Sequence, residues 1–367
     1  MPIHSDSWSF VYSHNKQSDA VTAIADANVK YIRPIDGISP VSIVKQTISD
    51  ANHAGKGNSH PSYFRVGGES FEIGSQARDC TDHELAMALF MVFGAVASVN
   101  VITDHYTHTF TWQAIAASPE SLYTTFMEQL GDGSTPGYKQ KIVGAWLDQM
   151  TIDIPAARDS FCKLTWQGRA RELAAAGAIT VPAAVTPASF MLPAYTTLKF
   201  GTAAAPVISA KGISGSLTFN KNSQPKNRWG NSSGEELLLA RADVGRQQVT
   251  GSLTLELDDV LRDHFKDDDT LEIILTLVSD EATPTAGVTK QCEITLPAVK
   301  IGSEGFAVED QTLTYTVNFP EGAVLKALLQ HLLLRVEDDV ILDMDPPTEP
   351  DESGNYPLPL PGFTNYL

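Results

Sequence analysis

Apolar and polar residues alternate strictly from residue 249 to residue 257, and this pattern constrains the fold of the chain more than any other. Successive side chains of an extended strand point to opposite faces. The apolar members of the run would share one face: Val249, Leu253, Leu255 and Leu257. The polar members would share the other: Thr250, Ser252, Thr254 and Glu256. The pattern predicts a strand with one face in a core and the other in water.

Similar short runs separated by Gly, Pro, Asn and Asp cover most of the chain, which predicts a mainly β protein. The clearest lie at residues 150–154, 162–166, 271–278, 292–296 and 313–319. Helical signals are few. We expect one helix over 82–98, with Asp82 as its cap and Glu84 in its first turn, and a shorter one over 258–265.

The length of 367 residues suggests two domains, at about 150 residues per domain. Composition places the boundaries. We expect a first β domain with an N-terminal arm at 1–172, a linker rich in Ala and Pro at 173–195, a second β domain at 196–344, and an acidic, Pro-rich arm at 345–367. Proline restricts the backbone of the linker and keeps the last segment out of a sheet interior.

The two halves also contain similar segments in the same order. Residues 37–43 resemble 212–219, residues 65–73 resemble 248–255, and residues 162–166 resemble 313–317. We infer a duplication in which the first half carries an insertion near 100–119. Because the second copy keeps one glycine where the first has Gly67 and Gly68, we expect a continuous strand with a glycine bend there, and not a hairpin turn.

Charge and cysteine content exclude several classes of protein. The net charge is −18, so the surface repels a phosphate backbone and a dedicated nucleic-acid binder is not expected. Three cysteines far apart, without CxxC spacing, predict buried free thiols in a reducing compartment. The first residues do not read as a signal peptide. The most apolar stretch, 85–99, is too short to span a membrane and is predicted to be a buried helix, so no membrane insertion is expected.

The search for chemistry predicts no catalytic, cofactor or metal site, and hence no enzyme. Residues 54–59 lack the spacing of a phosphate loop. His105 and His108 are three residues apart, which places them on opposite faces of a strand, so we interpret them as surface strand histidines. Neighbouring acidic residues favour solvated turns over a carboxylate pair held across a cleft.

Three segments carry a resemblance to a known family. They are the strand 249–257 with its short acidic helix, the glycine- and serine-rich strand 212–220, and residues 106–110 after a helix. Over about 35–339, the chain resembles the major tail tube proteins of long-tailed, siphovirus-type bacteriophages, in their double-domain form.

The resemblance implies two tandem β-sandwich or barrel domains, each with a flanking helix. In this family, strands of neighbouring subunits join into a barrel around a channel, and rings stack into a tube of the virion tail, assembled in the host cytoplasm. A doubled chain implies a trimeric ring with pseudo-sixfold symmetry; without duplication, a hexamer is the alternative. The implied partners are further copies of the chain, tape-measure and tail terminator proteins, and phage DNA in transit without specific binding.

An acidic, hydroxyl-rich wall would avoid the counterion release that makes proteins stick to DNA. We therefore expect a set of polar strand residues to face the lumen: Ser70, Glu72, Thr250, Ser252, Thr254 and Glu256. We also expect the linker, the insertion and the C-terminal arm to bridge subunits or rings.

Two other functions stay open on the sequence. One is another virion β-protein, for head–tail joining or decoration. The other is a β-sandwich that binds carbohydrate through its tryptophans, Trp8, Trp112, Trp146, Trp166 and Trp229.

Overall fold

The computed structural model describes most of the predicted strands and one helix. The described residues are 8–12, 16–17, 23, 31–34, 41–49, 64–74, 78–102, 105–113, 120–130, 139–157, 159–175, 189–201, 208–226, 241–256, 271–282, 288–299, 303–309, 312–319 and 333–338.

Within these residues the chain forms 22 strands and one α-helix, so the mainly β prediction is confirmed. The first half contributes β1 (Trp8–Tyr12), β2 (Tyr31–Pro34), β3 (Val41–Ser49), β4 (Phe64–Gly74), β5 (Arg78–Asp79), α1 (Asp82–Phe93), β6 (Gly94–Ile102), β7 (His105–Trp112), β8 (Thr124–Leu130), β9 (Lys139–Ile154), β10 (Lys163–Ala170) and β11 (Glu172–Ala175). The second half contributes β12 (Met191–Gly201), β13 (Ile208–Ala210), β14 (Gly212–Asn220), β15 (Gln224–Lys226), β16 (Arg241–Asp243), β17 (Gln248–Glu256), β18 (Leu271–Ala282), β19 (Thr289–Val299), β20 (Ser303–Glu309), β21 (Thr312–Phe319) and β22 (Leu333–Asp338).

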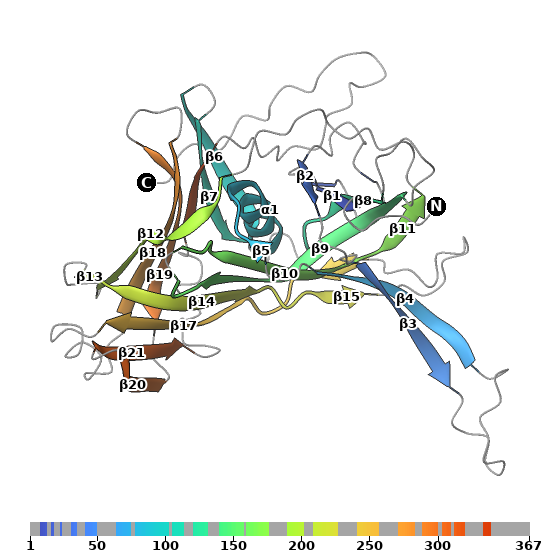
Figure 1. Cartoon of the computed structure of the whole chain (residues 1–367). Helices are drawn as coiled ribbons and strands as arrows, with labels where there is room; N and C mark the ends of the chain where they lie inside the picture. Colours follow the sequence, from blue (N-terminus) through green and yellow to red (C-terminus); the bar gives the residue numbers. More distant parts are fainter. Residues whose placement is uncertain are drawn as a thin grey trace, which may run out of the picture.

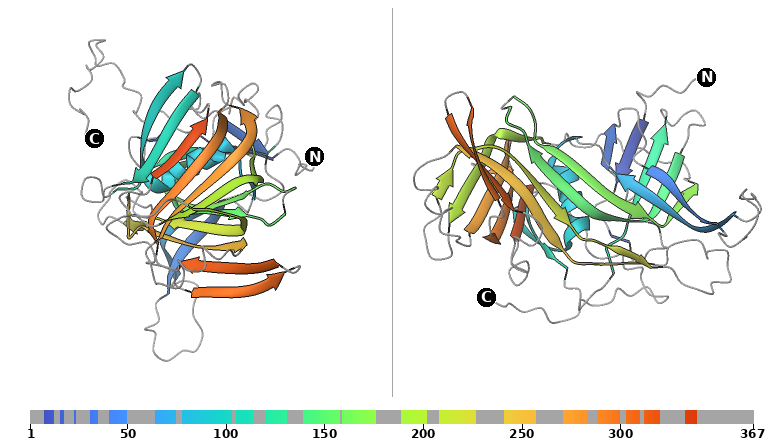
Figure 2. Two further views of the ribbon diagram at one scale, coloured as in Figure 1. Left: turned by 90° about the vertical axis from the view of Figure 1, so that its left-hand side faces the viewer. Right: turned by 90° about the horizontal axis from the view of Figure 1, so that it is seen from below.

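Two large antiparallel sheets contain most of these strands (Figure 1). The 13-stranded sheet includes a run of eight in the order β3-β4-β10-β9-β14-β17-β21-β20, and β1, β2, β8 and β11 extend it along the first part of β9. The seven-stranded sheet has the order β13-β12-β18-β19-β22-β7-β6. Figure 2 shows that the 13-stranded sheet bends away from the seven-stranded one where β3 and β4 project. Each sheet draws strands from both halves of the chain.

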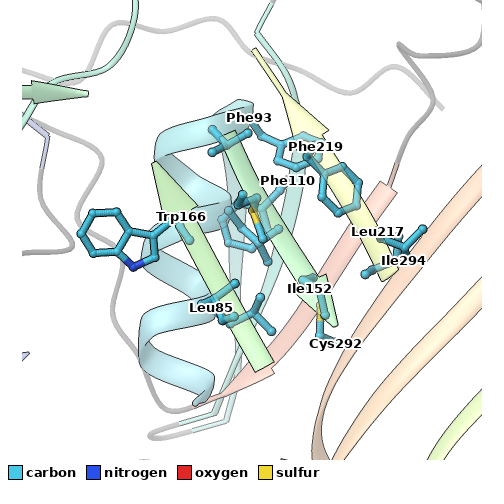
Figure 3. Packing of buried hydrophobic residues seen from close by; sticks show 14 of the residues in the cluster. Leu85, Phe93, Phe110, Ile152, Trp166, Leu217, Phe219, Cys292 and Ile294 are labelled. Atoms are coloured by element: carbon cyan, nitrogen blue, oxygen red, sulfur yellow. The ribbon is translucent and has the colours of Figure 1, made fainter. Parts of the chain in front are cut away.

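The core lies between these two sheets and around the helix (Figure 3). Leu217 and Leu253 contribute to it from the 13-stranded sheet, and Leu275 and Ile294 contribute from the seven-stranded one. All four are at most 2% exposed. Full burial of such a side chain contributes roughly 1.5–3 kcal/mol. The alternation along β17 and β18 therefore has the structural role that the sequence predicted.

Helix α1 is enclosed by the protein, and all 12 of its residues are buried. The helix begins at Asp82 and is buried, as predicted, but the predicted cap and the predicted end at residue 98 were wrong, and the helix is enclosed and does not flank the sheets. Thr81, not Asp82, is the N-cap, and the helix ends at Phe93 because Gly94 adopts the left-handed conformation with φ of 83°. The chain then continues as β6, so the apolar stretch that read as one helix is a helix followed by a strand.

Two lysines from the second half of the chain hold the two ends of α1. At the N-terminus, the Lys290 ammonium lies 3.1 Å from a carboxylate oxygen of Asp82. At the C-terminus, the Lys221 ammonium donates to the carbonyl oxygen of Met91 at 2.9 Å. A cation near a helix C-terminus also interacts favourably with the helix dipole. The helix of the first half is thus stabilised by side chains of the second.

Several local predictions can be compared with the structure. The strand through Gly67 and Gly68 is continuous, and its pairing with β3 shifts register at this point, as the glycine-bend interpretation requires. The three cysteines are buried and free, as predicted. The prediction for His108 was wrong: it is fully buried and shares a 2.7 Å hydrogen bond with Ser98, because it lies on the core-facing side of β7 with Phe110.

The structure bears on other predicted segments only in part. The ends of the expected linker are strands, since β11 ends at Ala175 and β12 begins at Met191. Most of the expected insertion near 100–119 belongs to β6 and β7. The expected helix 258–265, the glycine-rich 54–59 and the C-terminal arm 345–367 lie outside the described residues. In the described part, no helix combines the length and apolar character needed to cross a membrane.

Lys221 gives the stability of this core a specific pH dependence. Burial lowers its pKa from 10.5 to about 8, and the carboxylate of Asp148 opposes that shift. Between these values the unfolded chain binds more protons than the folded protein, so the free energy of unfolding rises with pH. Relative to Lys221→Met, we expect the wild-type free energy of unfolding to increase by about 1 kcal/mol from pH 7 to pH 9, measured by urea denaturation.

The matched control is Lys211→Met, because 81% of the Lys211 side chain is exposed. This variant should keep the shape of the wild-type pH profile. A constant difference between wild type and Lys221→Met across this pH range would contradict the assignment.

Candidate functional site

The outward face of four neighbouring strands is almost entirely polar, and we call it the polar face. Its 15 residues are half-buried or exposed. They are Lys163, Thr165 and Gln167 of β10; Gln149, Thr151 and Asp153 of β9; Ser214, Ser216, Thr218 and Asn220 of β14; and Gln248, Thr250, Ser252, Thr254 and Glu256 of β17. The residues between them, such as Ile152, Leu217 and Leu253, are buried in the core.

Strand register aligns residues of one chemical kind into rows across the polar face. One row is made of threonines: Thr165 of β10, Thr151 of β9, Thr218 of β14 and Thr250 of β17. The hydroxyls of Thr151 and Thr218 lie 2.9 Å apart and share a hydrogen bond. Cross-strand threonine pairs stabilise a sheet, and β-branched residues favour strands. The row therefore stabilises the sheet and also places hydroxyl groups on its surface.

Two further rows flank the threonines. On one side lies a row of amides: Gln167, Gln149, Asn220 and Gln248. On the other side, Asp153 is followed by Ser216, Ser252 and then Asn318 of β21. The polar surface also continues onto β21 through Thr254 and Thr316, whose hydroxyls lie 3.2 Å apart.

Charges on the polar face are few, and three of the charged side chains have polar or charged partners close by. Lys163 is the one cation among its 15 residues, and its ammonium forms an ion pair with Asp79. The Asp153 carboxylate accepts a hydrogen bond from the Ser216 hydroxyl. Glu256 lies 3.2 Å from the ammonium of Lys211. Such a surface has no cluster of cations that could condense onto phosphates.

The structure places all six predicted lumen residues in the same sheet. Four of them form the outward side of β17. In β4, Glu72 is exposed and stands opposite Arg169 of β10, while Ser70 stands opposite Val44 of β3. Strands β4 and β17 are separated by β10, β9 and β14, so the two predicted groups lie at different places along one surface.

Sequence reasoning missed the polar residues of the intervening strands. Thr151 and Thr218 lie between the two predicted groups, in β9 and β14. Their signal was present, because polar residues alternate with apolar ones in both strands. The order of strands in the sheet was needed to show that they belong to the same surface.

A bulge and a covering hairpin end the polar face. The pairing of β9 with β10 shifts between Gln167 and Gly168. Beyond it, Trp146 packs with Tyr123 and Ala242, and Ala242 belongs to the β15–β16 hairpin. The Ala242 amide donates to the Tyr123 hydroxyl at 2.8 Å, and burial raises the pKa of Tyr123 to about 12. This corner is therefore part of the packed structure and does not continue the polar surface.

The described residues contain no group of three or more His, Cys, Asp or Glu that could hold a metal ion. Three tryptophans of the carbohydrate interpretation are core residues, since Trp112, Trp146 and Trp166 are 7%, 1% and 2% exposed. Their rings are not available to stack on a sugar. The side chains of Trp8 and Trp229 lie outside the described residues.

Comparison with known proteins identifies a family. The family described as phage tail tube protein matches residues 57–320, which is well over half of the chain. The match runs from before β4 to the end of β21 and so includes the whole polar face. No curated protein matches the sequence.

Gly168 is required where β9 and β10 approach at the bulge. A Cβ atom there would collide with the carbonyl oxygen of Trp146 and lie 2.8 Å from the Cα of Leu147, both of which are backbone. Overpacking typically costs 1–3 kcal/mol. We expect Gly168→Ala to lower the free energy of unfolding by about 3 kcal/mol, measured by urea denaturation.

Gly74→Ala is the control, because its Cβ would only reach ordinary contact, 3.6 Å from the carbonyl oxygen of Trp166. Equal stability losses in the two variants would show that the close approach at Gly168 is not the cause.

Proposed function

The chain belongs to the phage tail tube protein family, a structural and non-enzymatic family of the virion tail, and we propose that it polymerises as stacked trimeric rings with pseudo-sixfold symmetry. The stacked rings form the hollow tube through which phage DNA passes. The polar face lines the lumen of that tube. The observation that carries this proposal is the eight-strand run, because it contains one strand order in two copies and its four central strands have a polar outward surface.

The repeat of strand order supports two quasi-equivalent units. In the first half, β3 pairs with β4, β4 with β10, and β10 with β9. In the second half, β14 pairs with β17, β17 with β21, and β21 with β20. The similar sequence segments fall on corresponding strands, since β3 corresponds to β14, β4 to β17 and β10 to β21. This agrees with the proposed division into domains at 1–172 and 196–344.

The number of strands favours three copies in the ring. A closed barrel of about eight strands is filled by its own side chains, so one copy cannot enclose a channel. Three copies give 24 strands and, at about 4.8 Å per strand, a circumference of about 115 Å and a diameter of about 37 Å before strand tilt. Six copies would double that diameter to about 73 Å. The smaller barrel leaves room for one DNA duplex with little excess.

The chemistry of the polar face suits a surface past which DNA slides. Protein affinity for DNA comes largely from cations that displace counterions from phosphates. The polar face offers hydroxyl and amide groups with one lysine, which is already paired with Asp79. The net charge of −18 adds long-range repulsion. Phage DNA would pass without specific binding, and tape-measure and tail terminator proteins would be the other partners of the tube.

Electron cryomicroscopy of the purified, polymerised protein tests the ring. We expect tubes whose rings contain three copies and show threefold symmetry, with an approximate sixfold repeat in the inner wall. Rings of six copies would contradict the doubled-domain proposal and leave the tube itself in place. Closed single rings that never stack would favour a joining protein.

Cations placed on the polar face should slow DNA passage without blocking assembly. In Thr250→Lys/Ser252→Lys, each ring of three copies would carry six added lysines in the lumen. We expect phage with normal tails and DNA ejection at least about tenfold slower at low salt, recovering at high salt because counterion release weakens. The measurement is DNA release triggered in vitro, at two salt concentrations.

Thr276→Lys is the matched control, because Thr276 lies on the outward side of β18 in the other sheet. Its ejection rate should equal that of wild type. Equal slowing by both substitutions would remove the polar face from the lumen.

A further inference from the structure

We propose that the ring closes by antiparallel pairing of β20 from one copy with β3 from the next, in one register. That register sets Val41 opposite Val308, Ile43 opposite Phe306, and Lys45 opposite Glu304. The inference rests on the proposed ring and adds to it the two strand edges that join and the residue pairs that select their alignment.

The two strands are the ends of the eight-strand run. Among the described residues, β3 pairs with β4 and β20 pairs with β21, and neither has a strand on its other side. Open edges of this kind are liable to pair with another chain. In Figure 1, β3 and β20 lie far apart, at opposite ends of the sheet. Seven strand spacings amount to about 34 Å, so the two edges of one copy do not meet.

The junction between β9 and β14 supplies the template for closure. It joins the last strand of the first four-strand unit to the first strand of the second, antiparallel, from Gly215 opposite Ile154 to Asn220 opposite Gln149. In the repeat, β20 corresponds to β9 and β3 corresponds to β14. A ring of repeated units therefore needs a second junction of the same kind, made by β20 and the β3 of the next copy.

The register of each edge strand within its own sheet identifies the two faces. Val41 stands opposite Ile73, which is buried, and Ser42 stands opposite Glu72, which is exposed. Positions 41, 43 and 45 of β3 are thus on the core side. In β20, Gly305 stands opposite Thr316, whose hydroxyl lies next to that of Thr254 on the polar face. Positions 304, 306 and 308 are thus on the core side.

Matching core side to core side leaves only registers that differ by steps of two residues. In the proposed register, apolar residues meet in two pairs and opposite charges meet in the third, and each of these favours pairing. A shift of two residues in one direction sets Ile43 opposite Glu304. A shift in the other direction sets Lys45 opposite Phe306. The proposed register also gives six residue pairs, as in the β9–β14 junction.

Engineered cysteines test the register. In the proposed junction Ser42 stands opposite Ala307, and directly opposed residues have Cα atoms about 4.5–5.5 Å apart, within the range for a disulfide. Tubes of Ser42→Cys/Ala307→Cys should cross-link under mild oxidation into covalent trimers, seen in a denaturing gel without reductant. Ser42→Cys/Gly305→Cys is the control, with the second cysteine two residues away. The native cysteines are buried and should not compete.

Charge reversal tests the same junction by assembly. Glu304 stands opposite Val317 in its own sheet, so Glu304→Lys would face an apolar residue there and Lys45 across the junction. We expect it to reduce the yield of tubes at least about tenfold, and Lys45→Glu/Glu304→Lys to recover most of it. The single variant Lys45→Glu is less informative, because Lys45 also stands opposite Glu69 of β4. Glu309→Lys, at the end of β20, is the matched control and should assemble normally.

The outcomes separate this junction from the proposed function. The junction and the proposed function are both supported if wild-type tubes form, the proposed cysteine pair cross-links, and the double charge reversal restores assembly. The junction is overturned if wild-type tubes form, the two cysteine variants cross-link equally or not at all, and Glu304→Lys assembles normally. That result leaves the proposed tube intact. Wild-type protein that forms neither rings nor tubes overturns the proposed function, and the junction with it.

Discussion

Pairing of β9 with β14 is the interaction on which the rest of this structure depends. Strand β9 belongs to the first half of the chain and β14 to the second, so their backbone hydrogen bonds make one sheet out of two similar four-strand units. The same pairing brings Thr151 beside Thr218 and so makes the polar face continuous. Without it, the hydroxyl and amide rows would end at an open edge of each unit.

Burial of α1 is a second interaction that joins the two halves. Its N-terminus carries Asp82 next to Lys290, and its C-terminus is capped by Lys221, so both buried cations come from the opposite half. A buried ion left without its partner costs several kcal/mol. Because each half satisfies polar groups of the other, the two units are repeated in strand order but not independent in energy. A helix enclosed in this way fixes how the two sheets face each other.

Two corrections to the sequence predictions have identifiable physical causes. The helix ended at Phe93 because Gly94 is left-handed, which the apolar run from 85 to 99 did not reveal. His108 was expected at the surface, but it lies on the same side of β7 as Phe110, and that side faces the core. In the first case a glycine inside the apolar run ends the helix, and in the second the contacts that bury one side of β7 come from distant segments of the core.

The sequence by itself determined which residues of strands such as β17 and β18 belong to the core, because side-chain alternation is a property of the extended backbone and needs no partner. It also determined the acidic charge and the resemblance that led to the family. Only the tertiary structure decided that strands from both halves share each sheet, that α1 is enclosed, and that Thr151 and Thr218 join the polar face. Strand order is decided by contacts between distant segments, and alternation reads the same for an edge strand as for a central one.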